Sequence, residues 1–296
     1  MITMEEIERK VEELPLLPYV MMGLLQLKPE EESFLDKVLK LSQQDPTFAL
    51  QIIRLANSTV PNKQIKSLQE AVASVAIQGM TGLIASMASL GVFVPVHQGE
   101  KDLWIHSIQV AVIASRMASL LPDLKIDPNQ AYMCGLLHDI GRFVMFDSVP
   151  SELQKVEAKN WQNPEELVDA ELDICGFDHS KLGGRVGIKW GLPETVRRVV
   201  AYHHMYTEQQ QKAIRNHDVH LSNLLNVIQL ADCLSMLLIN EPDILTGPEP
   251  VLIEALKKCN HPCLASVGLS LDNLKNMAKI GSEETIRLVQ GMGIIL

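Results

Sequence analysis

The sequence predicts an all-α fold, and three features of its composition and pattern support this. Hydrophobic residues make up 47% of the chain, but Phe, Trp and Tyr only 4%, a mixture that favours helices packed on helices over a β-sandwich. Apolar residues recur at helical spacing, and no stretch alternates apolar and polar residues for long enough to indicate a strand. With 296 residues, the chain can form one large domain or two ordinary ones.

Charge and cysteine content narrow the class of protein. Asp and Glu number 36 against 26 Lys and Arg, a formal net charge of -10, and a negative surface repels a phosphate backbone. The five cysteines are odd in number and form no Cys-x-x-Cys pair, as in proteins of a reducing compartment. The first residues lack the basic start and apolar core of a signal peptide. We therefore expect a cytoplasmic protein that does not bind nucleic acid directly.

The N-terminal part contains clear helix starts. Residues 5–27 combine a proline-punctuated stretch with a short apolar helix, and residues 31–44 show helical spacing of apolar residues. Asp45 and Pro46 fit the N-cap and first turn of a further helix. Ser67 and Glu70 fit a capping box that begins another. These signals predict a succession of short helices.

Residues 71–96 contain no charged residue. The length would allow a membrane span, but polar residues, glycines and a proline interrupt it: Ser74, Gln78, Gly79, Thr81, Gly82, Ser86, Ser89, Gly91 and Pro95. We therefore favour two buried helical pieces over a membrane span, although the segment could also form the face of a homodimer. The stretch from Gly91 to Gly99 is the best internal boundary.

Helical patterns continue through the rest of the chain. Residues 150–173 are more polar than their surroundings, and residues 205–219 predict a polar loop. The sequence shows no internal repeat. One predicted helix begins at residue 101, a second leads up to residue 139, and a third ends at residue 204. Further helical patterns cover residues 221–239, 249–258, 271–278 and 282–290.

His138 and Asp139 stand side by side at the end of an apolar helix. A charge in such a place must be paired or hold a metal, and imidazole with carboxylate suits Fe, Mn, Co, Ni or Zn. Gly141 would let the backbone turn sharply after the pair, and Arg142 offers a planar fork for phosphate or carboxylate. The alternative is that the two side chains hydrogen-bond each other and cap the helix.

Seven His and Asp residues interrupt apolar segments in this way. A single histidine in a helix is more often a satisfied core residue, and histidines at a helix C-terminus interact favourably with its dipole. An Asp in an apolar helix is harder to explain, because it needs a partner. Seven separate interruptions of apolar segments by His or Asp are improbable by chance, and together they predict one metal site built from several helices. The seven residues are His106, His138, Asp139, His179, His203, His204 and Asp232.

The order of these residues resembles the HD superfamily of metal-dependent phosphohydrolases, and the long set of His and Asp is similar to its HD-GYP branch. Further segments resemble the HDOD family, the HD-related output domain, and occur in the family's order over roughly residues 10–240. They are Asp45-Pro46 with Leu55-Ala-Asn-Ser58, Ser67-Leu-Gln-Glu-Ala71, Gly135-Leu-Leu-His-Asp-Ile-Gly141, Phe177-Asp-His-Ser-x-x-Gly-Gly184, Trp190-Gly-Leu-Pro193 and His203-His204.

The resemblance implies three helical parts and a set of functional residues. The parts are an N-terminal HDOD subdomain over residues 1–97, an HD-like subdomain with the metal site over residues 98–240, and a C-terminal extension over residues 241–296. The seven residues become metal ligands, for two ions if the site is filled, with Asp139 bridging and water activated by the ions as nucleophile. Asp139 and Arg142 would be catalytic. Arg142, Lys181 and Arg185 would bind phosphate, unless the last two are ordinary surface charges.

Two departures separate the chain from HD-GYP enzymes. The Gly-Tyr-Pro segment is absent, and Arg142 stands where those enzymes have Lys. We therefore expect a bacterial signal-transduction output module that binds divalent metal, together with a nucleotide second messenger or a signalling protein. The alternative is an active phosphohydrolase or phosphodiesterase that acts on a cyclic or linear nucleotide. A purely structural interaction domain is disfavoured, because the ligand set is full.

Overall fold

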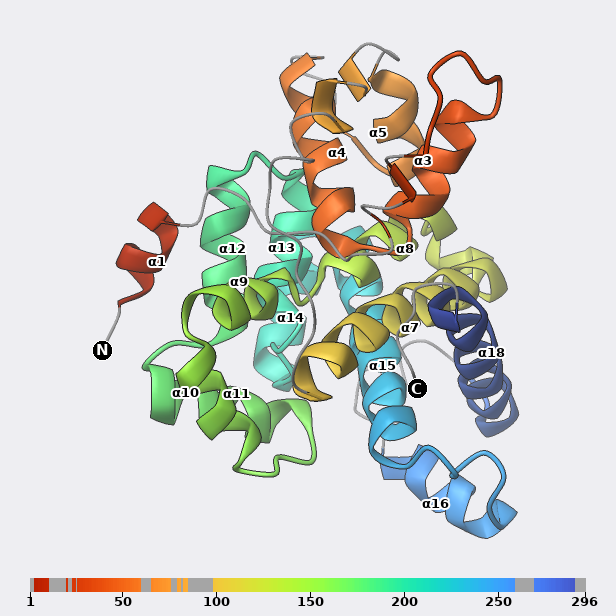
Figure 1. The fold of residues 1–296 in the computed structure, drawn as a ribbon. Coiled ribbons are helices and arrows are strands. Elements are labelled where there is room, and N and C mark those ends of the chain that lie inside the picture. Colours follow the sequence, from red (N-terminus) through yellow and green to blue (C-terminus); the bar gives the residue numbers. More distant parts are fainter. Residues whose placement is uncertain are drawn as a thin grey trace.

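The computed structural model describes residues 3–10, 20, 23–24, 26–59, 65–75, 79–80, 82–84, 98–258 and 269–290. Within these ranges every element is a helix and none is a strand, which confirms the predicted fold class. Figure 1 shows α3 (Phe34–Ser42), α4 (Pro46–Thr59) and α5 (Leu68–Ser74) packed together at one end of the molecule. The short α1 (Met4–Lys10) lies apart from these three helices and contacts α12 (His179–Lys189).

Two long apolar helices form the centre of the fold. They are α7 (Gln98–Leu120) and α15 (Val219–Asn240), which pack against each other. Both are long and apolar enough to cross a membrane, but 78% and 72% of their most apolar windows are buried inside the protein. They are thus the core around which other helices pack: α8 (Pro128–Leu137), α9 (Ile140–Ser148), α13 (Glu194–Tyr202) and α18 (Leu271–Gln290).

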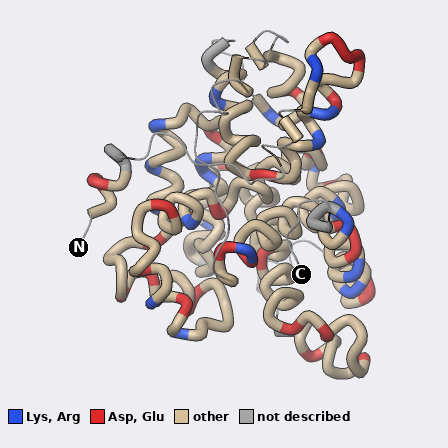
Figure 2. Tube along the Cα trace, in the orientation of Figure 1, with Lys and Arg blue, Asp and Glu red and all other residues tan. Residues whose placement is uncertain are grey.

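The remaining helices cover this core. They are the 3-10 turn η1 (Pro122–Leu124), α10 (Pro150–Glu157), α11 (Pro164–Cys175), α14 (Glu208–His217) and α16 (Glu249–Lys258). Basic and acidic residues are interspersed along the tube in Figure 2, for example on α18.

The predicted helix starts in the N-terminal part are confirmed. Asp45 Oδ1 accepts hydrogen bonds from the backbone N–H groups of Thr47 (2.8 Å) and Phe48 (3.2 Å) at the start of α4. Ser67 Oγ accepts from Glu70 N at 3.1 Å, and the Glu70 carboxylate accepts from the N–H of Lys66. Most of the uncharged segment lies outside the described residues, and so do residues 91–97 of the predicted boundary from Gly91 to Gly99. The last two residues of that boundary, Gln98 and Gly99, already belong to α7. The three-part division stays a prediction.

Two glycines bring helices close enough to assemble a site. A Cβ at Gly135 would lie 2.8 Å from Ala111 Cα, so α8 can lie directly on α7. A Cβ at Gly141 would lie 2.0 Å from the carbonyl oxygen of His179, where α9 packs on α12. The prediction that Gly141 serves a sharp turn was wrong: among the described glycines, positive φ occurs at Gly176 and Gly191. Its lack of a side chain is needed for contact between helices.

The prediction of a loop over residues 205–219 was wrong: most of these residues form α14. This helix is held by a capping box between Thr207 and Gln210 rather than by an apolar stripe. The two helical patterns predicted at the C-terminus are one continuous helix, α18, and the pattern predicted at residues 249–258 is α16.

Candidate metal centre

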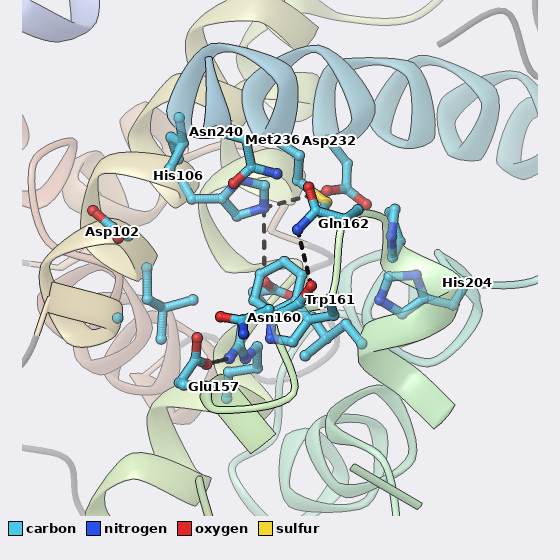
Figure 3. A pocket seen from close by; sticks show the side chains of 17 residues that line it. Asp102, His106, Glu157, Asn160, Trp161, Gln162, His204, Asp232, Met236 and Asn240 are labelled. Carbon is cyan, nitrogen blue, oxygen red and sulfur yellow. Dashed lines mark hydrogen bonds and ion pairs between the residues drawn. The ribbon is translucent and has the colours of Figure 1, made fainter. Parts of the chain in front are cut away.

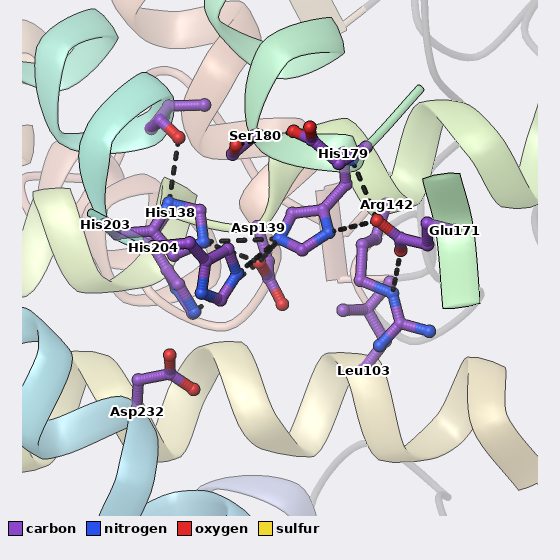
Figure 4. A network of polar contacts seen from close by, with 12 residues as sticks. Leu103, His138, Asp139, Arg142, Glu171, His179, Ser180, His203, His204 and Asp232 are labelled. Atoms are coloured by element: carbon purple, nitrogen blue, oxygen red, sulfur yellow. Dashed lines mark hydrogen bonds and ion pairs between the residues drawn. The ribbon is translucent and has the colours of Figure 1, made fainter. Parts of the chain in front are cut away.

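The seven predicted ligand residues converge on one point in the core. Figure 4 shows six of them, all except His106. His106 comes from α7 and Asp232 from α15, which cross at this point. His138 and Asp139 occupy the junction between α8 and α9, as C-cap of one helix and N-cap of the other. The remaining donors are His179 at the start of α12 and His203 and His204 just after α13. All are buried except His204, which is partly exposed.

Asp139 lies at the centre of this cluster. Its Oδ1 is 3.1 Å from His179 Nε2, 3.3 Å from His203 Nε2 and 3.7 Å from His138 Nε2, and its Oδ2 is 3.7 Å from His106 Nε2. Although burial favours the protonated acid, the imidazoles of His138 and His179 hold the pKa of Asp139 well below its usual value. The carboxylate is thus ionised and shared by two groups of donors.

The donors divide into two groups around Asp139. In the first, His106 and His138 approach within 3.2 Å through their Nε2 atoms, and Asp232 Oδ1 lies 3.3 Å from His106 Nε2. In the second, His179 Nε2 lies 3.3 Å from His203 Nε2 and 2.8 Å from His204 Nε2. The alternative of a simple helix-capping pair is wrong, because the Asp139 side chain makes no capping hydrogen bond and its Oδ1 lies 3.7 Å from His138 Nε2.

Backbone carbonyls fix the orientation of His138 and His203. The Nδ1 atom of His138 donates to Gly135 O (2.7 Å), and that of His203 donates to Val200 O (2.8 Å). Burial lowers the pKa of His138 to about 4. In the neutral ring, a proton on Nδ1 leaves Nε2 as a lone pair, so His138 directs an acceptor atom into the cluster.

His179 has a charged partner behind it. Its Nδ1 lies 2.6 Å from Glu171 Oε2, which also accepts from the His179 backbone N–H at 2.9 Å. Burial alone would lower the pKa of His179, but the carboxylates of Glu171 and Asp139 raise it to about 10. Buried carboxylates placed behind a histidine in this way are typical of metal sites, where they orient the ring and raise its basicity.

The two other histidines are anchored by hydroxyl groups. His106 Nδ1 lies 2.9 Å from Ser235 Oγ, which itself donates to Gln109 Oε1 at 2.8 Å. His204 Nδ1 lies 2.9 Å from the hydroxyl of Tyr206. Each of the five histidines is thus held through Nδ1 and presents Nε2 to the cluster.

Arg142 lies beside the cluster and is held by two carboxylates. Its Nη2 donates to Glu157 Oε1 at 2.5 Å, and its Nε lies 3.5 Å from Glu171 Oε1. The guanidinium also lies over the ring of Trp161, 5.4 Å from the ring centre. Burial alone would lower the pKa of Arg142, but Glu157 and Glu171 raise it. A chain of polar contacts therefore runs from Asp139 through His179 and Glu171 to Arg142.

A cavity of about 230 Å³ opens onto this cluster. Figure 3 shows its lining side chains, with residues of α15 along one side and the segment between α10 and α11 opposite. Arg142 is the only Lys or Arg among the described lining residues. Lining carboxylates are Asp102, Asp139, Glu157 and Asp232.

Lys181 and Arg185 do not line this cavity. Lys181 Nζ lies 2.7 Å from Asp178 Oδ2, and Arg185 pairs with Glu5 of α1 at 3.0 Å; both cations are exposed. Their predicted phosphate-binding role stays a prediction, and the geometry favours Arg142.

The donor set fits divalent transition metals. Imidazole nitrogen and carboxylate oxygen together are the ligands of Fe, Mn, Co, Ni and Zn. In addition, Asp232 Oδ2 is buried and makes no hydrogen bond within the described part of the chain, an arrangement that is costly unless a cation compensates it. The observed arrangement is therefore a buried His and Asp cluster suited to metal binding.

Sequence reasoning missed Glu171, Glu157 and Tyr206. Glu171 is fully buried, and its position was visible in the helical phase: Leu167, Ala170 and Cys175 occupy the same buried face of α11. Glu157 and Tyr206 do not interrupt an apolar helical pattern: Glu157 is the last residue of α10, and Tyr206 lies in the polar segment between α13 and α14.

Comparison with known proteins identifies the family of the chain. The model of the HDOD domain matches residues 14–206. An uncharacterised protein of Treponema pallidum (strain Nichols) is 26% identical over 199 residues, which are 66% of this chain and 38% of that protein. The chain thus matches well under half the length of this curated relative.

Two solved structures share the fold. The MmoQ response regulator of Methylococcus capsulatus str. Bath has a TM-score of 0.64 at 19% identity, covering 88% of this chain and 99% of that one. A virulence factor of Campylobacter jejuni subsp. jejuni has a TM-score of 0.64 at 14% identity, covering 96% of both chains. Since the family model covers more than half of the sequence, this chain belongs to the HDOD domain family.

Proposed function

We propose that this HDOD protein is a signal-transduction module that binds two divalent transition-metal ions and receives a small phosphorylated ligand beside them. The observation that carries the proposal is the convergence of five Nε2 atoms and two carboxylates, with every imidazole anchored through Nδ1. A remnant site that had lost its ligand would not need so complete a set of supporting contacts.

The two donor groups suggest how the ions would be held. His106, His138 and Asp232 would hold one ion, and His179, His203 and His204 the other, with Asp139 shared between them. Such ions supply Lewis acidity toward a phosphoryl oxygen and lower the pKa of bound water. The metal could be Fe, Mn, Co, Ni or Zn, since this donor set suits all of them.

The charge of the cavity makes ligand binding dependent on the ions. Four carboxylates and one guanidinium line it, so an anion would be repelled from the protein alone. Two divalent ions would reverse this balance. Arg142 would then contribute its guanidinium to a phosphate oxygen, provided that it exchanges its contact with Glu157.

A signalling role is supported by the fold and by how the site connects to the N-terminal helices. The MmoQ structure with the same fold is named a response regulator. In this chain α4 and α5 pack on α8, the helix that leads to His138. Occupancy of the site could therefore be passed to α4 and α5 and read by a signalling partner in the cytoplasm.

Hydrolysis of a phosphoester is the second candidate. It is favoured by the access that the cavity gives: His106, Asp139, His204 and Asp232 all line it. A ligand in the cavity would thus meet donors of both groups. The buried Asp139 would remain ionised and keep both groups together during such a reaction.

The first experiment is elemental analysis of the tag-free protein purified without chelators, beside His138→Ala. The proposal expects two transition-metal ions per chain, with loss of metal from the variant. Absence of metal in both samples would refute the metal site.

The metal-loaded protein is then assayed with p-nitrophenyl phosphate and bis-p-nitrophenyl phosphate, with Asp139→Ala as the control. Turnover that the substitution abolishes would establish the second candidate. No turnover with any of the five metals would leave the regulatory role as the function.

A further inference from the structure

A second cavity adjoins the one at the metal cluster. Its volume is about 700 Å³, and it lies between the end of α15, helix α16 and the segment before α11. Four residues line both cavities and form their common border: Gln162, Pro164, Met236 and Asn240. Figure 3 shows three of them, Gln162, Met236 and Asn240, at the edge of the first cavity. The two cavities thus adjoin across these four residues.

The sizes of the two cavities indicate how a ligand would divide between them. Ligand sites for small organic molecules are typically about 300–1,000 Å³. The first cavity, at about 230 Å³, falls below that range, whereas the second, at about 700 Å³, lies within it. The first cavity thus has room for a phosphoryl group but not for a large organic body as well, and the adjoining second cavity has room for that body.

The charges around the second cavity disfavour a second anionic group there. None of its described lining residues is Lys, Arg or His, and two of them, Glu241 and Glu254, are acidic. A phosphate placed there would meet carboxylates without a compensating cation, which is unfavourable in a partly enclosed site.

The other lining residues suit an uncharged body with polar edges. Met236, Leu237 and Val251 supply apolar surface, and Gln162 and Asn240 supply amide groups at the border. Amides can both donate and accept hydrogen bonds, and carboxylates accept them from N–H groups. A nucleoside offers this combination of flat apolar faces and N–H edges.

On the basis of the proposed function, we infer that the ligand is a phosphoester with a single phosphoryl group at the metal cluster and an uncharged, nucleoside-like body in the second cavity. A mononucleotide matches this description. A cyclic dinucleotide does not, because its second phosphate would lie beside Glu241 and Glu254.

The test is isothermal titration of the manganese-loaded full chain with GMP, inorganic phosphate and cyclic di-GMP. GMP should bind at least about tenfold more tightly than inorganic phosphate, and cyclic di-GMP should bind more weakly than GMP. Val251→Trp, at a half-exposed position of α16, should narrow the second cavity and remove the advantage of GMP without changing the affinity for phosphate.

Val219→Trp is the matched control. Val219 is as exposed as Val251, but it begins α15, at least about 20 Å along the helix from the cavity, and this variant should bind GMP normally. The inference is overturned if phosphate binds but GMP binds no more tightly, if cyclic di-GMP binds more tightly than GMP, or if Val251→Trp leaves GMP binding unchanged. Failure of phosphate itself to bind would overturn the proposed function and the inference with it.

Discussion

The two donor groups that share Asp139 differ in the atoms that contact the Nδ1 atoms of their histidines. The histidines of the first group are supported by neutral atoms, the Ser235 hydroxyl and the Gly135 carbonyl. In the second group, His179 is supported by the buried carboxylate of Glu171, which also contacts Arg142. Both groups reach the cavity, the first through His106 and Asp232 and the second through the partly exposed His204.

This difference predicts two unequal metal positions. A carboxylate behind a histidine raises the basicity of the ring and therefore its affinity for a metal. Of the five histidines, His179 has a carboxylate at its Nδ1 atom. We expect the second group to hold its ion tightly and the first to hold an ion that exchanges.

The largest effect should come from Asp139→Asn, because this substitution weakens both groups at once. It removes the charge of the shared ligand while keeping the size of the side chain. Metal content measured by elemental analysis should fall from two ions per chain toward none, with helicity by circular dichroism unchanged. Retention of either ion would show that the two groups do not depend on Asp139.

His106→Ala should separate the two positions. His106 belongs to the first group, whose other histidine and carboxylates cannot complete a site of four protein ligands without it. We expect one ion per chain to remain, and that ion should resist removal by dilute chelator. Loss of both ions would contradict the independence of the second group.

Glu171→Gln should weaken only the second position. The amide keeps the size of the side chain but loses the charge that acts on His179, and loss of such a supporting partner typically costs about 10–100-fold in metal affinity. Competition with a chromophoric chelator would measure this loss. Glu165→Gln, on the exposed face of the same helix, is the control, and equal weakening in both variants would argue against the role of Glu171.

The smallest expected effect concerns the ligand. Glu157 is partly exposed and competes for the Arg142 guanidinium. Since a partly exposed ion pair contributes up to about 1 kcal/mol, Glu157→Gln should raise the affinity of the metal-loaded protein for inorganic phosphate about two- to fivefold by titration calorimetry. Glu152→Gln on the same helix should leave it unchanged. Weaker phosphate binding in Glu157→Gln would mean that Glu157 supports Arg142 rather than competing with a ligand.

Much of the fold could be predicted because its local signals agree with its packing. Asp45 caps a helix as expected, and α7 and α15 are recognisable from their apolar length. Helix α14 was not predicted, because it is polar and depends on its capping box. Gly141 was identified, but its reason was not, since the contact it permits comes from α12, 38 residues later.

The site shows the same division. The His and Asp donors could be found because each interrupts an apolar pattern, and the structure brings all of them together. Glu171 was hidden among neighbouring acidic residues. Lys181 and Arg185 were chosen for their nearness to His179 in sequence. At two and six residues further along a helix, however, their side chains point about 160° and 120° away from that of His179. The sequence was therefore a better guide to which residues are metal donors than to the direction in which a side chain points.

The most direct test of two metal positions that share Asp139 is anomalous X-ray diffraction from crystals of the manganese-loaded protein. The account predicts two anomalous peaks about 3.5–4 Å apart, one beside His106 and His138 and one beside His179 and His203, with the peak beside His106 and His138 weaker after a chelator soak. A single peak, or peaks only at surface carboxylates, would contradict it.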